Sequence, residues 1–77
     1  MNKEIEQMVG NNLRALRIQH GFTQDALAAQ MQLRGCDITR SAIAKIEVGQ
    51  RHLYPDEIIL IHEILGVTYE ALFHIQS

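Results

Sequence analysis

The side chains with the clearest chemical potential in this chain are Arg40, Ser41 and Lys45, which fall within six residues of one another. An arginine or lysine donates hydrogen bonds to an acceptor pair such as O6 and N7 of guanine, and a serine hydroxyl adapts to several bases. Ala44 stands among them, and a small apolar side chain packs against a thymine methyl group. These residue types predict contact with the edges of DNA bases, provided that one helix face presents them together.

Helical geometry places these residues on one face. At about 100° per residue, Ala42, Ile43 and Ile46 cluster on one side of a helix, and the polar positions spread over the other. The apolar side would anchor the helix while the polar side reads bases. The alternative is an ordinary solvated face, because charged outer faces are common on helices.

One short pattern, present three times, predicts where helices begin. Each copy has an apolar residue, a threonine, two variable residues, an alanine and another apolar residue, and the copies cover 22–27, 38–43 and 67–72. The threonine hydroxyl can accept a hydrogen bond from a free backbone N–H of the first turn, and the residue before it packs on the following turn. The second copy predicts a helix that begins beside Arg40.

Periodicity completes a prediction of five helices and no strand. A first helix covers about 3–20, and a fourth begins at Pro55, because a proline loses no hydrogen bond in a first turn. Gly10 weakens the middle of the first helix, so we expect its start to fray or to pack only through a partner. Gly35 fits a left-handed stop after the second helix. The predicted inner positions are Ile5, Val9, Leu13, Leu16, Leu27, Ala28, Met31, Ile58, Ile61, Leu65, Leu72 and Phe73.

Length and composition limit the possibilities further. The 77 residues suit one small domain over 1–77, and they include neither a long apolar run nor a signal segment, so we expect a cytoplasmic protein without membrane contact. Cys36 has no second cysteine to pair with. His20, His52, His62 and His74 show no metal-ligand spacing, and we expect no metal and no cofactor. No nucleophile, base and carboxylate stand in a recognisable arrangement, so we expect no enzyme.

The charge distribution bears on DNA binding. The net charge of −2 is an objection, because DNA-binding domains are often basic. However, residues 1–33 carry no net charge, residues 34–51 carry +2, and residues 52–77 carry −4. The positive segment contains the proposed reading helix, and the acidic end could face away from phosphate. We therefore expect modest DNA affinity that falls with salt.

Five segments, taken together, resemble one family. They are LRALR at 13–17, GFTQ at 21–24, LA at 27–28, IAKIEVG at 43–49 and LGVT at 65–68. In this order they resemble the XRE family of Cro- and phage-repressor-like helix-turn-helix proteins over about residues 9–73. The resemblance implies a compact all-α, five-helix, lambda-repressor-like domain whose second and third helices form the helix-turn-helix. It also implies a transcriptional regulator, a repressor, that inserts its third helix into the major groove of double-stranded DNA.

The resemblance implies roles for individual residues. Gln24 would match the family's phosphate-contacting and orienting glutamine, and Arg17 with Glu47 would form an ion pair that holds Arg17 near the DNA backbone. The alternative for this pair is a surface contact worth about 0–1 kcal/mol. Arg51 would meet a phosphate or remain solvated. The full set of candidate DNA-binding residues is Thr23, Gln24, Thr39, Arg40, Ser41, Ala44, Lys45 and Arg51.

One segment departs from the family pattern. A helix-turn-helix turn usually has about 3–4 residues, whereas residues 33–38 form a longer stretch here. We interpret Arg34 and Gly35 as the lengthened end of the second helix, and Cys36 and Asp37 as a connector. Cys36 could sense redox conditions, but we favour an inert small residue, because no resolving partner is evident.

Small helix-turn-helix domains commonly bind two half-sites about 34 Å apart as a twofold dimer, and we expect a homodimer here. The resemblance places its interface at the fifth helix and the loop before it. The interface candidates are Tyr69, Leu72, Phe73 and Ile75, with Ile59 as a further one. Alternatively, Leu72 and Phe73 only complete the core of each protomer. A rival function is an antitoxin or anti-regulator whose main partner is a protein, such as a toxin or an antagonist. The acidic, apolar-rich final segment favours that alternative.

Overall fold

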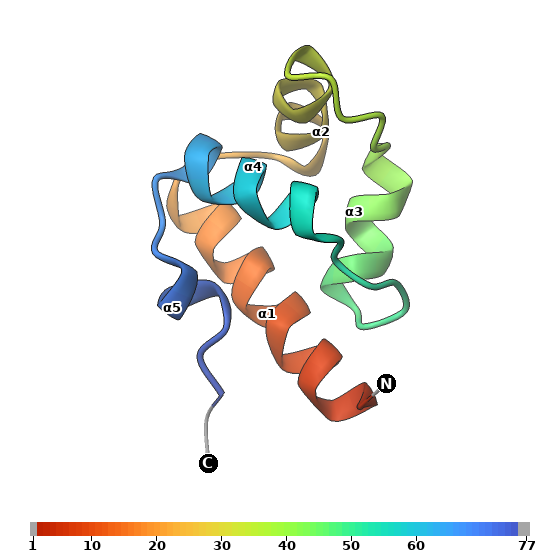
Figure 1. The fold of residues 1–77 in the computed structure, drawn as a ribbon, viewed down its shortest axis with the longest axis vertical. Helices are drawn as coiled ribbons and strands as arrows, with labels where there is room; N and C mark the ends of the chain where they lie inside the picture. Colours follow the sequence, from red (N-terminus) through yellow and green to blue (C-terminus); the bar gives the residue numbers. More distant parts are fainter. Residues whose placement is uncertain (1, 76–77) are drawn as a thin grey trace.

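Five helices follow one another along residues 2–75, the part of the chain that the computed structural model describes. They are α1 (Lys3–Gln19), α2 (Gln24–Leu33), α3 (Arg40–Glu47), α4 (Pro55–Leu65) and α5 (Tyr69–Leu72). No strand occurs within these residues, so the predicted all-α fold is confirmed (Figure 1). Over the same residues, none of the helices combines the length and the apolar character that crossing a membrane requires.

Threonine hydroxyls begin three of the helices, as the repeated pattern predicted. Each accepts a hydrogen bond from the backbone N–H three positions later, at 3.0 Å for Thr23, 3.1 Å for Thr39 and 3.0 Å for Thr68. These bonds satisfy N–H groups that have no partner inside the helix. The cap at Thr39 fixes Arg40 as the first residue of α3.

The long connection between α2 and α3 has a defined conformation. Gly35 has a φ of +86°, a value that strains any residue with a Cβ atom, so the predicted left-handed stop is confirmed. The Gln32 side-chain amide donates a hydrogen bond to the Ile38 carbonyl at 2.7 Å. Ile38 is itself 2% exposed. The connection is therefore attached to the core at its far end, directly before α3 begins.

The core receives side chains from every helix. The largest fully buried ones are Leu13, Leu27, Met31, Ile38, Ile43, Ile46, Ile61 and Leu72. Two predicted inner residues lie instead at the edge of the core, because Ile5 is 46% exposed and Phe73 is 40% exposed. They stand near the two ends of the described chain, where fewer neighbours cover them.

Gly10 allows α1 and α3 to cross at very close range. A Cβ atom at this position would lie 2.2 Å from the carbonyl oxygen of Ile46 and 2.9 Å from that of Glu47. Only a hydrogen atom fits there. α1 runs without interruption from Lys3, and the Asn2 side chain accepts the N–H of its first turn. α1 is thus continuous through Gly10, and the glycine serves the close crossing with α3; fraying of the start of α1 stays a prediction.

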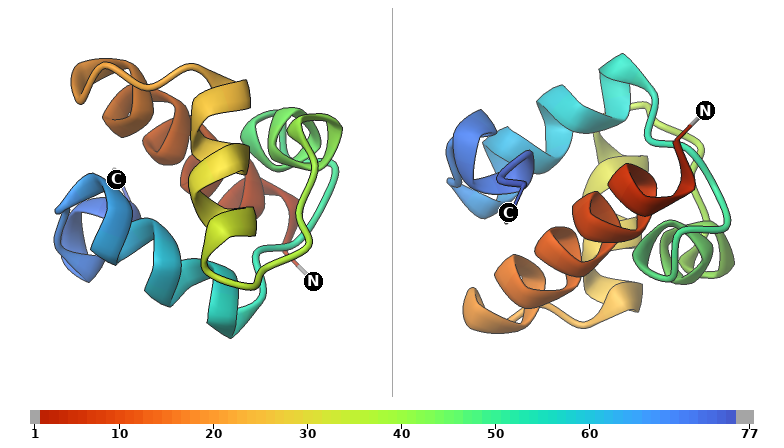
Figure 2. Two further views of the ribbon diagram at one scale, coloured as in Figure 1. Left: turned by 90° about the horizontal axis from the view of Figure 1, so that it is seen from above. Right: turned by 90° about the horizontal axis from the view of Figure 1, so that it is seen from below.

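Asn12 attaches the end of the fold to α1. Its side-chain amide donates hydrogen bonds to the carbonyl of Leu72 at 2.9 Å and to that of His74 at 2.8 Å. An isolated helix as short as α5 has almost no stability of its own. The asparagine therefore places α5 on the side of α1 opposite to α3, as Figures 1 and 2 show.

Candidate nucleic-acid interface

α3 separates its residues into an inner and an outer face, as predicted. Ile43 is 1% exposed and Ile46 is 2% exposed, so they anchor the helix. The outer face carries Arg40, Ser41 and Lys45, which are exposed, and Ala44, which is partly exposed. The structure therefore brings together on one accessible face the four α3 residues that the sequence selected for base contact.

A buried ion pair fixes the end of this helix. The guanidinium of Arg17 donates hydrogen bonds to both carboxylate oxygens of Glu47, at 2.7 and 3.0 Å. Their side chains are only 9% and 2% exposed. Arg17 also donates to the carbonyl of Phe22 at 2.8 Å, in the loop that leads into α2. The pair predicted from the family resemblance is therefore present, and it is buried rather than a surface contact.

Gln24 joins the same carboxylate. Its side-chain amide donates a hydrogen bond to Oε1 of Glu47 at 3.0 Å, from the first residue of α2. Glu47 therefore accepts bonds from α1 and α2 while it belongs to α3. This arrangement fixes the start of α2 relative to the outer face of α3, which is the geometry that a helix-turn-helix requires.

An open hollow lies where the start of α2 meets the start of α3. Its lining residues are Arg17, Ile18, Gly21, Phe22, Thr23, Gln24, Asp25 and Arg40. A helix N-terminus presents free N–H groups and a partial positive charge, which favour an anion such as a DNA phosphate. Thr23, Gln24 and Arg40, all selected from the sequence, therefore share one surface.

Asp25 also belongs to this surface, although sequence reasoning did not select it. One oxygen of its carboxylate lies 3.8 Å from Nε of Arg40, and the side chains are 79% and 63% exposed. The pair links the first turn of α2 to the first turn of α3. The two residues stand 15 positions apart in the chain, so no local pattern connects them.

Arg51 lies in a different setting from the one expected. Its guanidinium donates to both carboxylate oxygens of Glu57 at 2.9 and 3.0 Å, and it lies 5.1 Å from the centre of the Tyr54 ring. The hydrogen bond to Glu57 raises the pKa of the Arg51 guanidinium. The backbone N–H of Tyr54 donates to the same carboxylate at 3.0 Å. Arg51 thus helps to hold the start of α4. A phosphate that contacts Arg51 would have to share the N–H donors of the guanidinium with Glu57.

Sequence reasoning also missed Glu57. A glutamate at the third position of a helix is the acidic member of a capping box, so Glu57 could have been recognised as a cap from its place after Pro55. Its ion pair with Arg51 depends on how the preceding loop folds back, which the local pattern does not show. The carboxylate is buried, at 5% exposure.

The residues expected at a dimer interface divide into two groups. Tyr69, Phe73 and Ile75 are 43%, 40% and 45% exposed, and Ile59 is 48% exposed. Leu72 is fully buried within the protomer. It therefore leaves the set of interface candidates, because its side chain has no surface to offer, and it fills the core instead.

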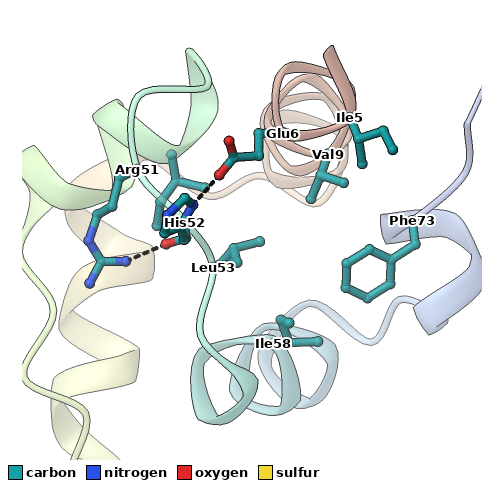
Figure 3. A pocket seen from close by; sticks show the side chains of 9 residues that line it. Ile5, Glu6, Val9, Arg51, His52, Leu53, Ile58 and Phe73 are labelled. Carbon is teal, nitrogen blue, oxygen red and sulfur yellow. Dashed lines mark hydrogen bonds and ion pairs between the residues drawn. The ribbon is translucent and has the colours of Figure 1, made fainter. Parts of the chain in front are cut away.

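A smaller apolar hollow lies between α1, α4 and α5 (Figure 3). It has a volume of about 180 Å³, and the apolar residues shown around it include Val9, Leu53, Ile58 and Phe73. A close contact between Nδ1 of His52 and the Glu6 carboxylate lies at its rim. Small-molecule sites usually enclose about 300–1,000 Å³. The hollow is an incompletely covered edge of the core rather than a site of that size.

Comparisons with known proteins agree with this geometry. A family model described as helix-turn-helix matches residues 13–72. The crystal structure of the restriction-modification controller protein C.AhdI from Aeromonas hydrophila is 28% identical in sequence, with a TM-score of 0.76 over 88% of this chain and 96% of that one. The DNA-binding domain of BldD is 23% identical, with a TM-score of 0.77 over 95% of this chain and 99% of that one. A comparison with curated proteins found no match.

Proposed function

Because the chain belongs to the XRE family of helix-turn-helix proteins, we propose that it represses transcription by placing α3 in the major groove of operator DNA. The family and the solved relatives support its coarser assignment as a DNA-binding transcription regulator. In the proposal the protein acts in the cytoplasm and needs no catalytic activity. A bound domain would block access to a promoter.

The observation that carries this proposal is the outer face of α3. Arg40 and Lys45 are exposed donors that suit guanine, and Ser41 stands beside them. The buried carboxylate of Glu47 joins their helix to α1 and α2, so the position of the α3 backbone is set before DNA binds. Preorganised donors lose less conformational entropy on binding than mobile ones.

Phosphate contacts would come from the start of α2. Thr23 and Gln24 lie at this helix end, beside the open hollow. Contacts of this kind set the position of a protein on the duplex and carry no sequence information. We therefore assign Gln24 and Thr23 to positioning, and Arg40, Ser41, Ala44 and Lys45 to base reading. Thr39 supports both roles indirectly, because it caps α3.

We propose further that two protomers associate through exposed apolar side chains of α4, α5 and the residues after α5, and that the dimer binds an inverted repeat. Tyr69, Phe73, Ile75 and Ile59 would form the contact. A symmetric dimer doubles the number of phosphate contacts, which matters for a chain with a net charge of −2. The same apolar residues could instead bind another protein, and this keeps the antitoxin or anti-regulator function as the second candidate.

Selection from a random duplex library at near-physiological salt tests the proposal. The wild-type protein is compared with an Arg40→Ala/Lys45→Ala variant whose helical content is verified by circular dichroism. We expect the wild type to enrich an inverted repeat and the variant to lose it, with a cost of about 1–3 kcal/mol for each base contact. If the wild type enriches no sequence, base reading is contradicted and the protein-partner function takes precedence.

A further inference from the structure

An acidic side chain stands where the proposed function requires an approaching phosphate. Asp25 is the second residue of α2, and the exposed fraction of its side chain is 79%. It is the acidic member of the set that lines the hollow at the start of α2. A carboxylate stabilises a helix N-terminus. Its negative charge, however, weakens the positive potential that would otherwise attract a DNA phosphate to this end of the helix. A carboxylate at this position without a positive partner therefore lowers the affinity for an approaching phosphate.

The geometry of the Asp25–Arg40 pair gives this carboxylate a second effect. The nearest approach between the two groups, at 3.8 Å, is from the Asp25 carboxylate to Nε of Arg40. A guanidinium is a planar fork with five donors. Because this nearest contact is at Nε and is too long for a hydrogen bond, the donors of the two terminal nitrogens remain available for the acceptor pair of a guanine.

We propose that Asp25 is a specificity-determining residue, which acts by positioning Arg40 for a base and by repelling phosphate. This inference rests on the proposed DNA-binding function. On a matching sequence, Arg40 contacts its base while it keeps its partner Asp25. On other sequences Arg40 has to leave Asp25 to reach a phosphate, and the uncompensated carboxylate then faces the DNA backbone.

The variant Asp25→Asn tests this role, because it keeps the shape of the side chain and removes the charge. Dissociation constants are measured by fluorescence anisotropy for the selected operator and for a scrambled duplex, at several salt concentrations. We expect binding to the scrambled duplex to tighten by up to about fivefold, the size of an exposed charge interaction. Binding to the operator should stay unchanged or weaken, so the ratio of the two constants falls.

Asp56→Asn is a matched control. Asp56 is also the second residue of a helix, is also exposed, and loses the same charge in the same substitution. It lines a different hollow with Arg34 and Cys36, at the opposite end of α2. Because Ile59 lines the same hollow, sedimentation equilibrium first verifies that Asp56→Asn leaves the proposed dimer unchanged. We expect it to leave the ratio between operator and scrambled duplex as it is in the wild type.

A double-mutant cycle distinguishes positioning from general charge. In an Arg40→Ala background, Asp25→Asn should no longer change the ratio, because the residue through which it acts is gone. An unchanged ratio in Asp25→Asn alone, or an equal fall in the Arg40→Ala background, overturns the inference. A wild-type protein with no preference for the operator would instead overturn the proposed function itself, so the two failures are distinguishable.

Discussion

Glu47 is the residue on which the candidate interface depends most. Its carboxylate accepts hydrogen bonds from Arg17 and Gln24, and its side chain is 2% exposed. A buried pair of this kind contributes little net stability compared with an apolar pair, because both charges lose their hydration. The pair instead sets the geometry of the fold, because the Glu47 carboxylate of α3 binds side chains of α1 and α2. Removing only one partner leaves the other charge buried without compensation.

We expect Glu47→Ala to lower the free energy of unfolding by about 3–5 kcal/mol, because the Arg17 guanidinium would then be buried without a counter-ion. Urea denaturation measures this loss. Asp25→Asn removes one partner of an exposed pair and should cost less than about 1 kcal/mol. Equal effects of the two substitutions would show that burial does not distinguish these pairs.

The surroundings of Cys36 bear on the alternative that this residue senses redox conditions. Burial, followed by the nearby carboxylates of Glu57 and Asp56, raises the pKa of the Cys36 thiol. The folded state therefore favours the neutral thiol. The contribution of Cys36 to the free energy of unfolding is fully present below the pKa of this thiol in the unfolded chain, and it is lost as the pH rises through the pKa of the thiol in the folded protein. A sensing cysteine requires a lowered pKa instead.

We expect iodoacetamide to modify Cys36 more slowly in the folded protein than in the urea-unfolded chain, with a pH midpoint shifted upward. Rates measured between about pH 7 and pH 10 cover this range. A folded-state midpoint below that of the unfolded chain would reverse our interpretation and favour a reactive thiolate.

At the scale of helices, the close crossing of α1 and α3 depends on Gly10. An alanine normally stabilises a helix interior by about 1 kcal/mol relative to glycine. Here its Cβ would lie 2.2 Å from the carbonyl oxygen of Ile46, so the helices must separate. We expect Gly10→Ala to destabilise the fold by about 1–3 kcal/mol despite the gain in propensity.

Thermal unfolding measures the effect of Gly10→Ala. Ala15→Gly, at an exposed position of the same helix, gives the propensity difference without a clash. If Gly10→Ala raises the melting temperature, the two helices separate without cost and the close crossing is not required by the fold.

The elements differ in how far the sequence predicts them. The threonine caps were predictable, because a cap is a contact between residues three positions apart. The burial of Gly10 and the two bonds of Asn12 were not, because each depends on a segment at least 36 positions away. The Arg17–Glu47 pair followed from the family resemblance, whereas its burial became evident only from the packing of α1 against α3.

At the scale of the whole molecule, α3 and α5 lie on opposite sides of α1 (Figure 2). A protomer can therefore present α3 to DNA while α5 faces a partner. The C-terminal segment over 52–77 contains four acidic residues and no lysine or arginine. Glu70 of this segment belongs to α5, so the proposed dimer would place its charge near the contact between the protomers.

We expect sedimentation equilibrium to show a dimer that Ile75→Glu weakens by tenfold or more, equal to about 1.4 kcal/mol, because a charge would be buried in the contact. Leu33→Glu is the control, since Leu33 is 78% exposed at the end of α2 and is not in the proposed interface. A wild-type monomer at high concentration and on operator DNA would remove the dimer proposal.

The two hydrogen bonds of Asn12 also set an order of events during protein synthesis. The carbonyls that accept them belong to residues 60 and 62 positions later in the chain. At about 5–20 residues per second, a ribosome needs about 3–12 s to add that length. During this interval the carbonyl groups that accept the hydrogen bonds of Asn12 have not yet been synthesised. The residues of α3 are therefore synthesised before those of α5, so association through the proposed α5 surface has to wait for the later residues.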